Sequence, residues 1–257
     1  KPELAARWGL QRIPVVAGAS DNAAGAIGVG IIAPGQCMLS LGTSGVSFAV
    51  TEGFLANPES AVHSFCHALP HTWHLMSVML SAASCLDFTA ALTGHTDVPA
   101  MLVDAEQAGM KSSLPYFLPY LTGERTPHNN PSAKGVFFGL DATTDRADLA
   151  NATLEGVGFG LLDGLEALEA TGLNLGEISV IGGGSRSAYW LQMLADIFGR
   201  PLCQRAGGEV GPALGAARLA HLALHPEADF AAICPVPPVK QIFNPSAQRH
   251  AYFRNAR

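Results

Sequence analysis

The chain has 257 residues, of which 48% are hydrophobic and 14% charged, with 15 Lys and Arg residues against 21 Asp and Glu residues. This composition predicts a compact domain with a large core and excludes disordered, coiled-coil and low-complexity chains. The net charge of −6, without a basic cluster, argues against a nucleic-acid partner. The longest apolar run, residues 75–86, is interrupted by serines and is too short to span a membrane.

The cysteines indicate the cellular compartment of the protein, and the first residues indicate whether the sequence is part of a longer chain. The five cysteines are odd in number, far apart and never in a CxxC pair, which is typical of reduced thiols in the cytoplasm. Residues 1–4, KPEL, contain neither an initiating Met nor an export signal. We therefore expect a cytoplasmic protein whose sequence has been cut from a longer chain or processed.

The amino-terminal region predicts a strand, a tight turn and then a helix. Residues 13–17 form a short apolar run typical of a buried strand. Residues 21–31, DNAAGAIGVGI, begin with two N-cap formers and continue with small apolar residues, as in a helix packed closely on a sheet. Asp21 is either a plain N-cap or a general base whose charge the helix N-terminus favours.

A hairpin is predicted next, with strands at residues 37–41 and 46–50 around Gly42-Thr43-Ser44-Gly45. Glycines allow backbone N–H groups to point toward one position, and the two hydroxyls add donors, as phosphate binding requires. The same four residues also make a good ordinary hairpin turn, so both interpretations stay open. Ser44 does not fit the nucleophile elbow of hydrolases, since a strand follows it and not a helix.

The middle of the chain alternates strand and helix signals. Residues 72–78 indicate a strand and residues 80–92 a helix that Gly94 ends. A long helix is predicted from a cap at Thr144 or Asp145 through residue 170. Its four glycines, at 156, 158, 160 and 164, indicate either close packing on a sheet or a hinge or ligand contact.

A second strand, glycine turn and helix follow. Residues 178–181 indicate a buried strand, and Gly182-Gly183-Gly184-Ser185 leads into a helix that ends at Gly199. The glycines would let a flat or anionic ligand approach the backbone, but the spacing matches neither the dinucleotide fingerprint nor a P-loop. Residues 201–204 and a helix from Pro212 to about 224 complete the pattern.

Four histidines within twelve residues, His63, His67, His71 and His74, suggest a zinc site. However, Pro70 prevents them from sharing a helical face, and Cys66 is the only other ligand type among them. We therefore predict no metal site made by these side chains.

Several motifs, in order from about residue 15 to 224, resemble the carboxy-terminal half of sugar kinases of the FGGY family. They are AGASDNAAGAIGVG (17–30), LSLGTSGV (39–46), NPESAVHSFCHALP (57–70), FLPYLTGERTPHNNP (117–131), GVFFGLDATTDRADLANATLE (135–155) and SVIGGGSRSAYWLQMLADIFG (179–199). The resemblance implies an α/β domain with an actin-like ATPase, ribonuclease-H-like fold: a mixed sheet flanked by helices. Residues 1–225 would form the ATP-side lobe of a two-lobe kinase, and residues 226–257, rich in proline, a surface-running tail of the same domain.

The resemblance also implies roles for individual residues. Asp21 matches the catalytic aspartate that takes the proton of the sugar hydroxyl, and Asp21 with Asn22 would contact the substrate. Gly42, Thr43 and Ser44 match a phosphate loop, and the residues that match the turn under the adenosine are Gly182, Gly183, Gly184 and Ser185. Arg125, in the GERTP stretch, would either touch ligand or form a buried structural ion pair.

The implied reaction is transfer of the γ-phosphate of ATP, with Mg²⁺, to D-xylulose. The alternatives are a kinase for another ketopentose, gluconate or glycerol, or a non-catalytic actin-like nucleotide-binding module. The main partner would be an amino-terminal lobe outside these residues, which supplies most sugar contacts, and a homodimer of the intact enzyme is possible. We therefore expect the 257-residue chain to be inactive or nearly inactive by itself, and to bind neither nucleic acid nor membrane.

Overall fold

The structure is a computed structural model that describes residues 1–10, 13–109, 111, 114–206 and 211–257. Within these residues, the main sheet has seven strands in the order β3-β4-β2-β1-β7-β8-β9. Strand β1 pairs in parallel with β7, and β7 with β8, whereas the remaining pairs are antiparallel. The bounds are β1 (Cys37–Leu41), β2 (Gly45–Thr51), β3 (His63–Cys66), β4 (Trp73–Met79), β7 (Ile178–Ile181), β8 (Leu202–Arg205) and β9 (Val239–Phe243).

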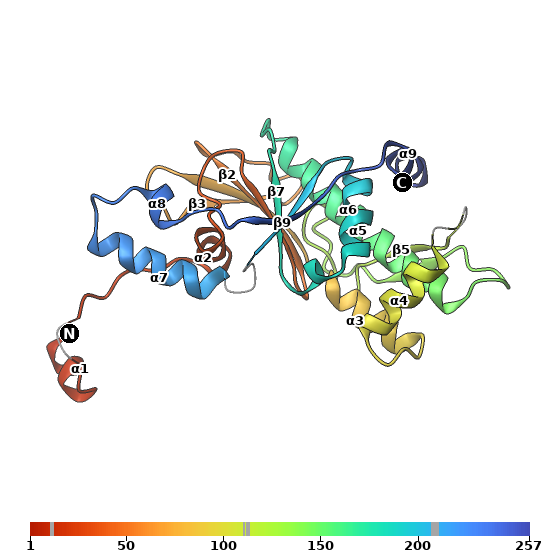
Figure 1. The fold of residues 1–257 in the computed structure, drawn as a ribbon, viewed down its shortest axis with the longest axis horizontal. Coiled ribbons are helices and arrows are strands. Elements are labelled where there is room, and N and C mark those ends of the chain that lie inside the picture. The colour runs from red at the N-terminus through yellow and green to blue at the C-terminus, as the bar shows by residue number, and fades with distance from the viewer. Residues whose placement is uncertain (11–12, 110, 112–113, 207–210) are drawn as a thin grey trace.

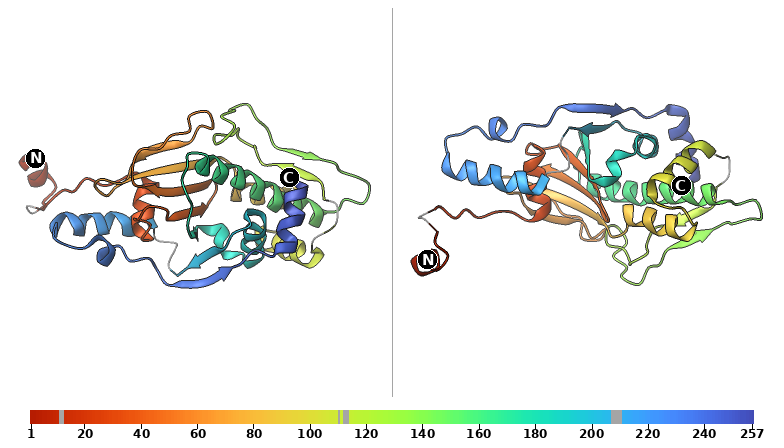
Figure 2. Two further views of the ribbon diagram at one scale, coloured as in Figure 1. Left: turned by 90° about the horizontal axis from the view of Figure 1, so that it is seen from above. Right: turned by 60° about the horizontal axis from the view of Figure 1, so that its bottom comes forward.

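Helices cover both faces of this sheet (Figures 1 and 2). One face carries α2 (Asp21–Gly28), α7 (Gly211–Leu224) and the short α8 (Phe230–Ile233). The other carries α3 (Ala83–Leu92), α4 (Val98–Ala108), α5 (Arg146–Glu169), α6 (Ala188–Phe198) and α9 (Ala247–Ala256). A separate hairpin of β5 (Tyr116–Leu118) and β6 (Val136–Phe138) lies beside α5. Among the described helices, none is long and apolar enough to cross a membrane.

The predicted hairpin is confirmed, and it places apolar side chains on both faces of the sheet. β1 and β2 pair in antiparallel fashion across the Gly42–Ser44 turn. Because successive strand residues point to opposite faces, Leu39 and Leu41 enter the core under α5 and α6, while Met38 packs on the α2 side with Phe48. The central strands are therefore buried on both sides, which accounts for their continuous apolar runs.

The long helix α5 begins and ends where the sequence predicts. Asp145 accepts hydrogen bonds from the backbone N–H groups of Ala147 (2.9 Å) and Asp148 (3.0 Å), and Asp148 accepts one from the N–H of Asp145 (3.0 Å). Gly172, just beyond the helix, has a φ of +88°. The four glycines of α5 make close contacts with β4, β5 and α6, which favours close packing over a hinge.

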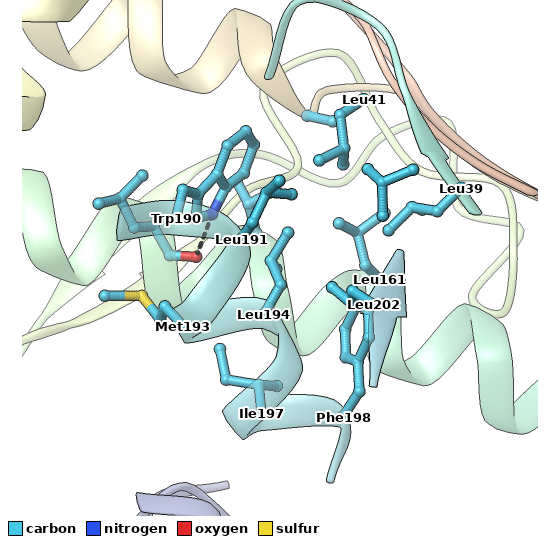
Figure 3. Close-up of a cluster of buried hydrophobic side chains, with 14 of the residues drawn as sticks. Leu39, Leu41, Leu161, Trp190, Leu191, Met193, Leu194, Ile197, Phe198 and Leu202 are labelled. Carbon is cyan, nitrogen blue, oxygen red and sulfur yellow. Dashed lines mark hydrogen bonds between the residues drawn. The ribbon is translucent and has the colours of Figure 1, made fainter. Parts of the chain in front are cut away.

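The largest core lies between the sheet and the helices α5 and α6 (Figure 3). Leu191 and Leu194 of α6 pack there with Leu39 and Leu161, and all four side chains are buried. Trp190 is also fully buried, and its Nε1–H donates to the carbonyl oxygen of Leu154 at 3.3 Å. This hydrogen bond satisfies the indole donor that burial would otherwise leave without a partner.

The expectation of a buried strand at residues 13–17 is wrong. This segment is extended but pairs with no strand among the described residues, and Ile13 and Val15 are 59% and 94% exposed. Together with α1 (Pro2–Arg7) it projects away from the body of the domain (Figure 1). An apolar run predicts burial only where a partner surface reaches it, and the described residues provide none.

The segment 226–257 contributes more to the fold than a surface-running tail would. Its strand β9 pairs with β8 at the edge of the sheet, and α9 packs on α6. Four of the five residues of β9 are exposed, but Phe243 and Phe253 are 3% and 1% exposed. The sequence analysis missed this strand and helix because only one apolar residue of each is buried.

Candidate active site

Asp21 lies at the start of α2, where its side chain reaches an open cavity. Ser20 is the N-cap and Asp21 the first helical residue, so the plain N-cap interpretation of Asp21 is wrong. The Asp21 carboxylate is exposed, and its Oδ1 accepts a hydrogen bond from the backbone N–H of Asn22 (2.8 Å). The deprotonated form of this carboxylate is the form that can accept a proton.

The turn at Gly42–Ser44 is held by its carbonyl groups. The carbonyl oxygen of Thr43 accepts from the N–H of Ala82 (2.9 Å) and from the hydroxyl of Ser84 (2.9 Å), which join the turn to the start of α3. The Thr43 and Ser44 hydroxyls, by contrast, make no hydrogen bond to any residue that the structure describes. Two donors are thus available for an anion at a rigid turn.

The glycine turn after β7 forms a short 3₁₀ helix, Gly183–Arg186, ahead of α6. Gly182 has a φ of +88°, and its Cα lies against the backbone of Leu41, so both conformation and space require glycine. Gly183 faces open space. The hydroxyl of Ser185 donates to the Gly182 carbonyl (2.6 Å), and Ser185 lines none of the three cavities described below.

Three cavities with shared lining residues lie beside these turns. Two of them border the turns after β1 and β7, at the carboxyl ends of the strands, where α/β sheets bind ligands. The central cavity, of about 440 Å³, is lined by Asp21, Asn22, Gly42, Ser44, Gly182 and Gly183, among others. The structure thus brings together residues that are up to 191 positions apart in the sequence, since the lining extends from Asp21 to Pro212.

The Trp190 cavity, of about 650 Å³, opens on one side of the central cavity. It shares Gly42 and Gly183 with the central cavity, and Thr43, Gly184 and Trp190 also line it. The sequence analysis missed its far wall, which consists of Val98, Pro99, Leu102 and Glu106 of α4 and Tyr189 of α6. A short apolar helix of this kind carries no local signal for ligand binding.

Tyr189 connects this wall to α5. Its hydroxyl donates to Asn151 Oδ1 at 2.7 Å, and Asn151 Nδ2 donates to the carbonyl of Ala105 at 3.0 Å. Burial raises the pKa of Tyr189 to about 12, so the phenol keeps its proton and remains a donor at neutral pH. The hydrogen bonds hold α4, α5 and α6 in one arrangement around the cavity.

The Arg125 cavity, of about 730 Å³, is lined by residues of β2, β3 and β4. It shares Asp21, Asn22 and Ser44 with the central cavity, and His63, His74 and Arg125 also line it. Arg125 is exposed, and its guanidinium forms no ion pair with any described residue. The interpretation of Arg125 as half of a buried structural ion pair is therefore wrong.

Two of the four histidines between residues 63 and 74 pack on an aromatic ring. His74 stacks on Phe48 with ring centroids 4.2 Å apart, and His67 meets the same ring edge-on at 5.6 Å. Burial lowers the pKa of both His67 and His74 to about 4, so both are neutral at pH 7. Within the described ranges, no three His, Cys, Asp or Glu side chains are placed to hold a metal ion.

Comparison with known proteins identifies relatives of this chain. The model of the C-terminal domain of the FGGY family of carbohydrate kinases matches residues 37–224. The chain is 59% identical over 256 residues to the xylulose kinase of Escherichia coli (strain K12) and 57% identical over 253 residues to that of Klebsiella pneumoniae. These matches cover 100% and 98% of this chain, but 53% and 52% of the relatives.

The comparison of structures agrees. The crystal structure of a xyloylose kinase from Brucella ovis matches with a TM-score of 0.91 and 42% identity, covering 100% of this chain and 53% of that one. The chain therefore spans about half the length of the relatives that it matches.

Proposed function

This chain belongs to the FGGY family of carbohydrate kinases and contains its C-terminal domain, and we propose that it forms the nucleotide-side lobe of an ATP-dependent kinase for D-xylulose. Its mixed sheet flanked by helices has the actin-like ATPase fold of that family, as the sequence predicted. The observation that carries the proposal is the shared lining of the central cavity, where the carboxylate of Asp21 and the turn at Gly42–Ser44 face the same space.

Each part of the cleft has a role in this proposal. The Trp190 cavity takes the adenosine, over Gly183 and Gly184. Gly182 and Ser185 shape the turn beneath it, because the Ser185 hydroxyl donates to the Gly182 carbonyl. The apolar walls suit a base, and the open backbone at Gly183 lets a flat ligand approach closely.

The phosphates extend from there to the hairpin turn. The N–H groups of the turn and the hydroxyls of Thr43 and Ser44 bind them, since charge neutralisation and positioning are what phosphoryl transfer mainly requires. Asp21, with Asn22 beside it, accepts the proton of the sugar hydroxyl that attacks the γ-phosphate. The residues that bind the phosphates thus lie on the β1–β2 hairpin, and the residue that removes the proton lies on α2. Both elements are rigid.

Magnesium fits this cleft as a partner of the nucleotide. Mg²⁺ is usually bound by one or two carboxylates together with substrate phosphates and water, and Asp21 is the carboxylate that lines the central cavity among the residues that the structure describes. When bound, the ion neutralises charge on the phosphates. The chain's own side chains position the phosphates and the acceptor hydroxyl around it.

The proposal assigns the remaining half of the enzyme to residues outside this chain. An amino-terminal lobe would supply most sugar contacts, and the complete protein, with a possible homodimer, would act in xylose metabolism. The odd number and wide spacing of the five cysteines support a reducing compartment such as the cytoplasm. We expect the 257-residue chain without that lobe to phosphorylate D-xylulose very slowly or not at all, and robust turnover by the purified chain would contradict this.

The test is kinetics of the full-length enzyme on a panel of D-xylulose, a second ketopentose, gluconate and glycerol. Wild-type enzyme should prefer D-xylulose, and Asp21→Asn should lower kcat by about 10²- to 10⁴-fold while nucleotide affinity is kept. Glu227→Gln, at an exposed carboxylate, is the matched control. Full turnover by Asp21→Asn would mean that Asp21 is not the base. ATP binding by a wild-type enzyme that phosphorylates no acceptor of the panel would favour a non-catalytic nucleotide-binding module.

A further inference from the structure

The Arg125 cavity is lined by one carboxylate and one guanidinium group among the described residues. Asp21 is its negative group, and Arg125 is its positive group, among the described residues that line it. The two histidines in its wall add no charge at neutral pH: burial and the charge of Arg125 lower the pKa of His63, and burial lowers that of His74 to about 4. A cation therefore faces the cavity that the base and Ser44 also line.

The loop that carries Arg125 is held rigidly at its backbone. Glu124, 3% exposed, accepts hydrogen bonds through Oε1 from the N–H groups of Leu80 (3.0 Å) and Arg125 (2.7 Å). The next residue, Thr126, donates its hydroxyl to the carbonyl of Ala61 (3.0 Å) and its N–H to that of Val78 (3.2 Å). The loop is thus fixed to β4 and to the residue that follows it, Leu80, immediately on both sides of Arg125.

Unlike the side chains of Glu124 and Thr126, the side chain of Arg125 does not hold the loop in place. Its neighbours in sequence are buried and hydrogen-bonded, whereas its own guanidinium is exposed and makes no ion pair within the described part of the chain. A rigid backbone that presents an unpaired cation to a cavity is the arrangement expected of an anion-binding residue. Guanidinium groups bind phosphate with two parallel hydrogen bonds, which gives both charge and geometry.

We propose that Arg125 binds the phosphoryl group on the acceptor side of the cleft, during its transfer and in the sugar-phosphate product. This inference rests on the proposed function. Ser44 lines both the central and the Arg125 cavities, so a group that leaves the hairpin turn toward an acceptor hydroxyl at Asp21 enters the space that Arg125 faces. The residue makes and breaks no covalent bond: it balances negative charge on the phosphoryl oxygens.

The experiment compares Arg125→Met, Arg125→Lys and a control, Lys134→Met, in the full-length enzyme. Lys134 is an exposed cation of the same connection between β5 and β6, and it lines none of the three cavities. The measurements are kcat, the KM values for ATP and sugar, and the inhibition constant of the sugar-phosphate product, with the acceptor that wild-type enzyme uses. Thermal unfolding shows whether each variant is folded.

Arg125→Met should lower kcat and weaken product inhibition by about 10- to 100-fold each, the range for losing a charge-assisted hydrogen bond, with the KM for ATP and the Tm unchanged. Arg125→Lys should recover part of both, because it keeps the charge but loses the bidentate geometry. If wild-type enzyme is active and Arg125→Met matches Lys134→Met in kcat and product inhibition, the inference is wrong. If wild-type enzyme phosphorylates no acceptor of the panel, the proposed function itself fails.

Discussion

Gly215 on α7 lies directly against the backbone carbonyl of Ala24 on α2, so closely that a Cβ atom at Gly215 would overlap the Ala24 oxygen. The two helices make an extensive contact, and Arg218 of α7 donates to the carbonyl oxygens of Ile27 (2.8 Å) and Gly28 (3.0 Å) at the end of α2. Because α2 begins with Asp21, the position of the proposed base depends on the close approach of α7.

Gly215→Ala should therefore destabilise the protein. Alanine favours a helix by about 1 kcal/mol over glycine, but the added methyl group must displace α2, and overpacking of this kind costs about 1 to 3 kcal/mol. We expect a lower Tm and a lower kcat, with a smaller relative change in the KM for ATP. Gly53→Ala, where a Cβ meets open space, is the control, and a Gly215→Ala protein as stable as wild type would contradict the prediction.

Replacing Thr43 and Ser44 together by alanine should weaken ATP binding more than adenosine binding. Their hydroxyls bond to no described residue, so the substitutions remove no hydrogen bond of the fold and should leave the Tm close to that of wild type. Two lost hydroxyl contacts to phosphate should raise the Kd for ATP by about 10- to 100-fold. Calorimetric titration with both ligands measures this, and equal effects on ATP and adenosine would place the phosphates elsewhere.

Glu155 should make the protein less stable as the pH rises. It lies on α5 and is 6% exposed, its Oε1 has no hydrogen-bond partner in the described part of the chain, and burial raises its pKa from 4.5 to about 7 despite the nearby Arg249. The folded state therefore holds a proton that the unfolded state releases between pH 4.5 and 7. The stabilisation is complete below pH 4.5 and is lost as the pH rises through about 7.

Glu155→Gln, neutral at every pH, removes this loss. Its free energy of unfolding should exceed that of wild type by up to about 3 kcal/mol at pH 8 and differ little at pH 4. Urea unfolding of wild type, Glu155→Gln and the exposed-site control Glu52→Gln across this range tests the sign. A stability difference that does not grow with pH would mean that the carboxyl group is charged in the folded state.

Much of the local structure could be predicted because its causes lie within a few residues. The turn between β1 and β2 follows from Gly42-Thr43-Ser44-Gly45, and the limits of α5 follow from the Asp145 cap and Gly172. The glycine turn at 182–184 likewise follows from its sequence. Turn geometry and capping depend on neighbours in the chain, so the sequence by itself determined these elements and, through their order, the family.

Contacts between distant segments had to come from the tertiary structure. Only packing decided that Val15 is exposed, that β9 completes the sheet, and that Arg125 faces Asp21 across a cavity and forms no buried ion pair. The sequence of an apolar run, of an edge strand or of a loop that contains an arginine is the same whether or not another segment covers it. Their burial and charge environment depend on which surfaces meet, and that is set by long-range packing, which no local pattern encodes.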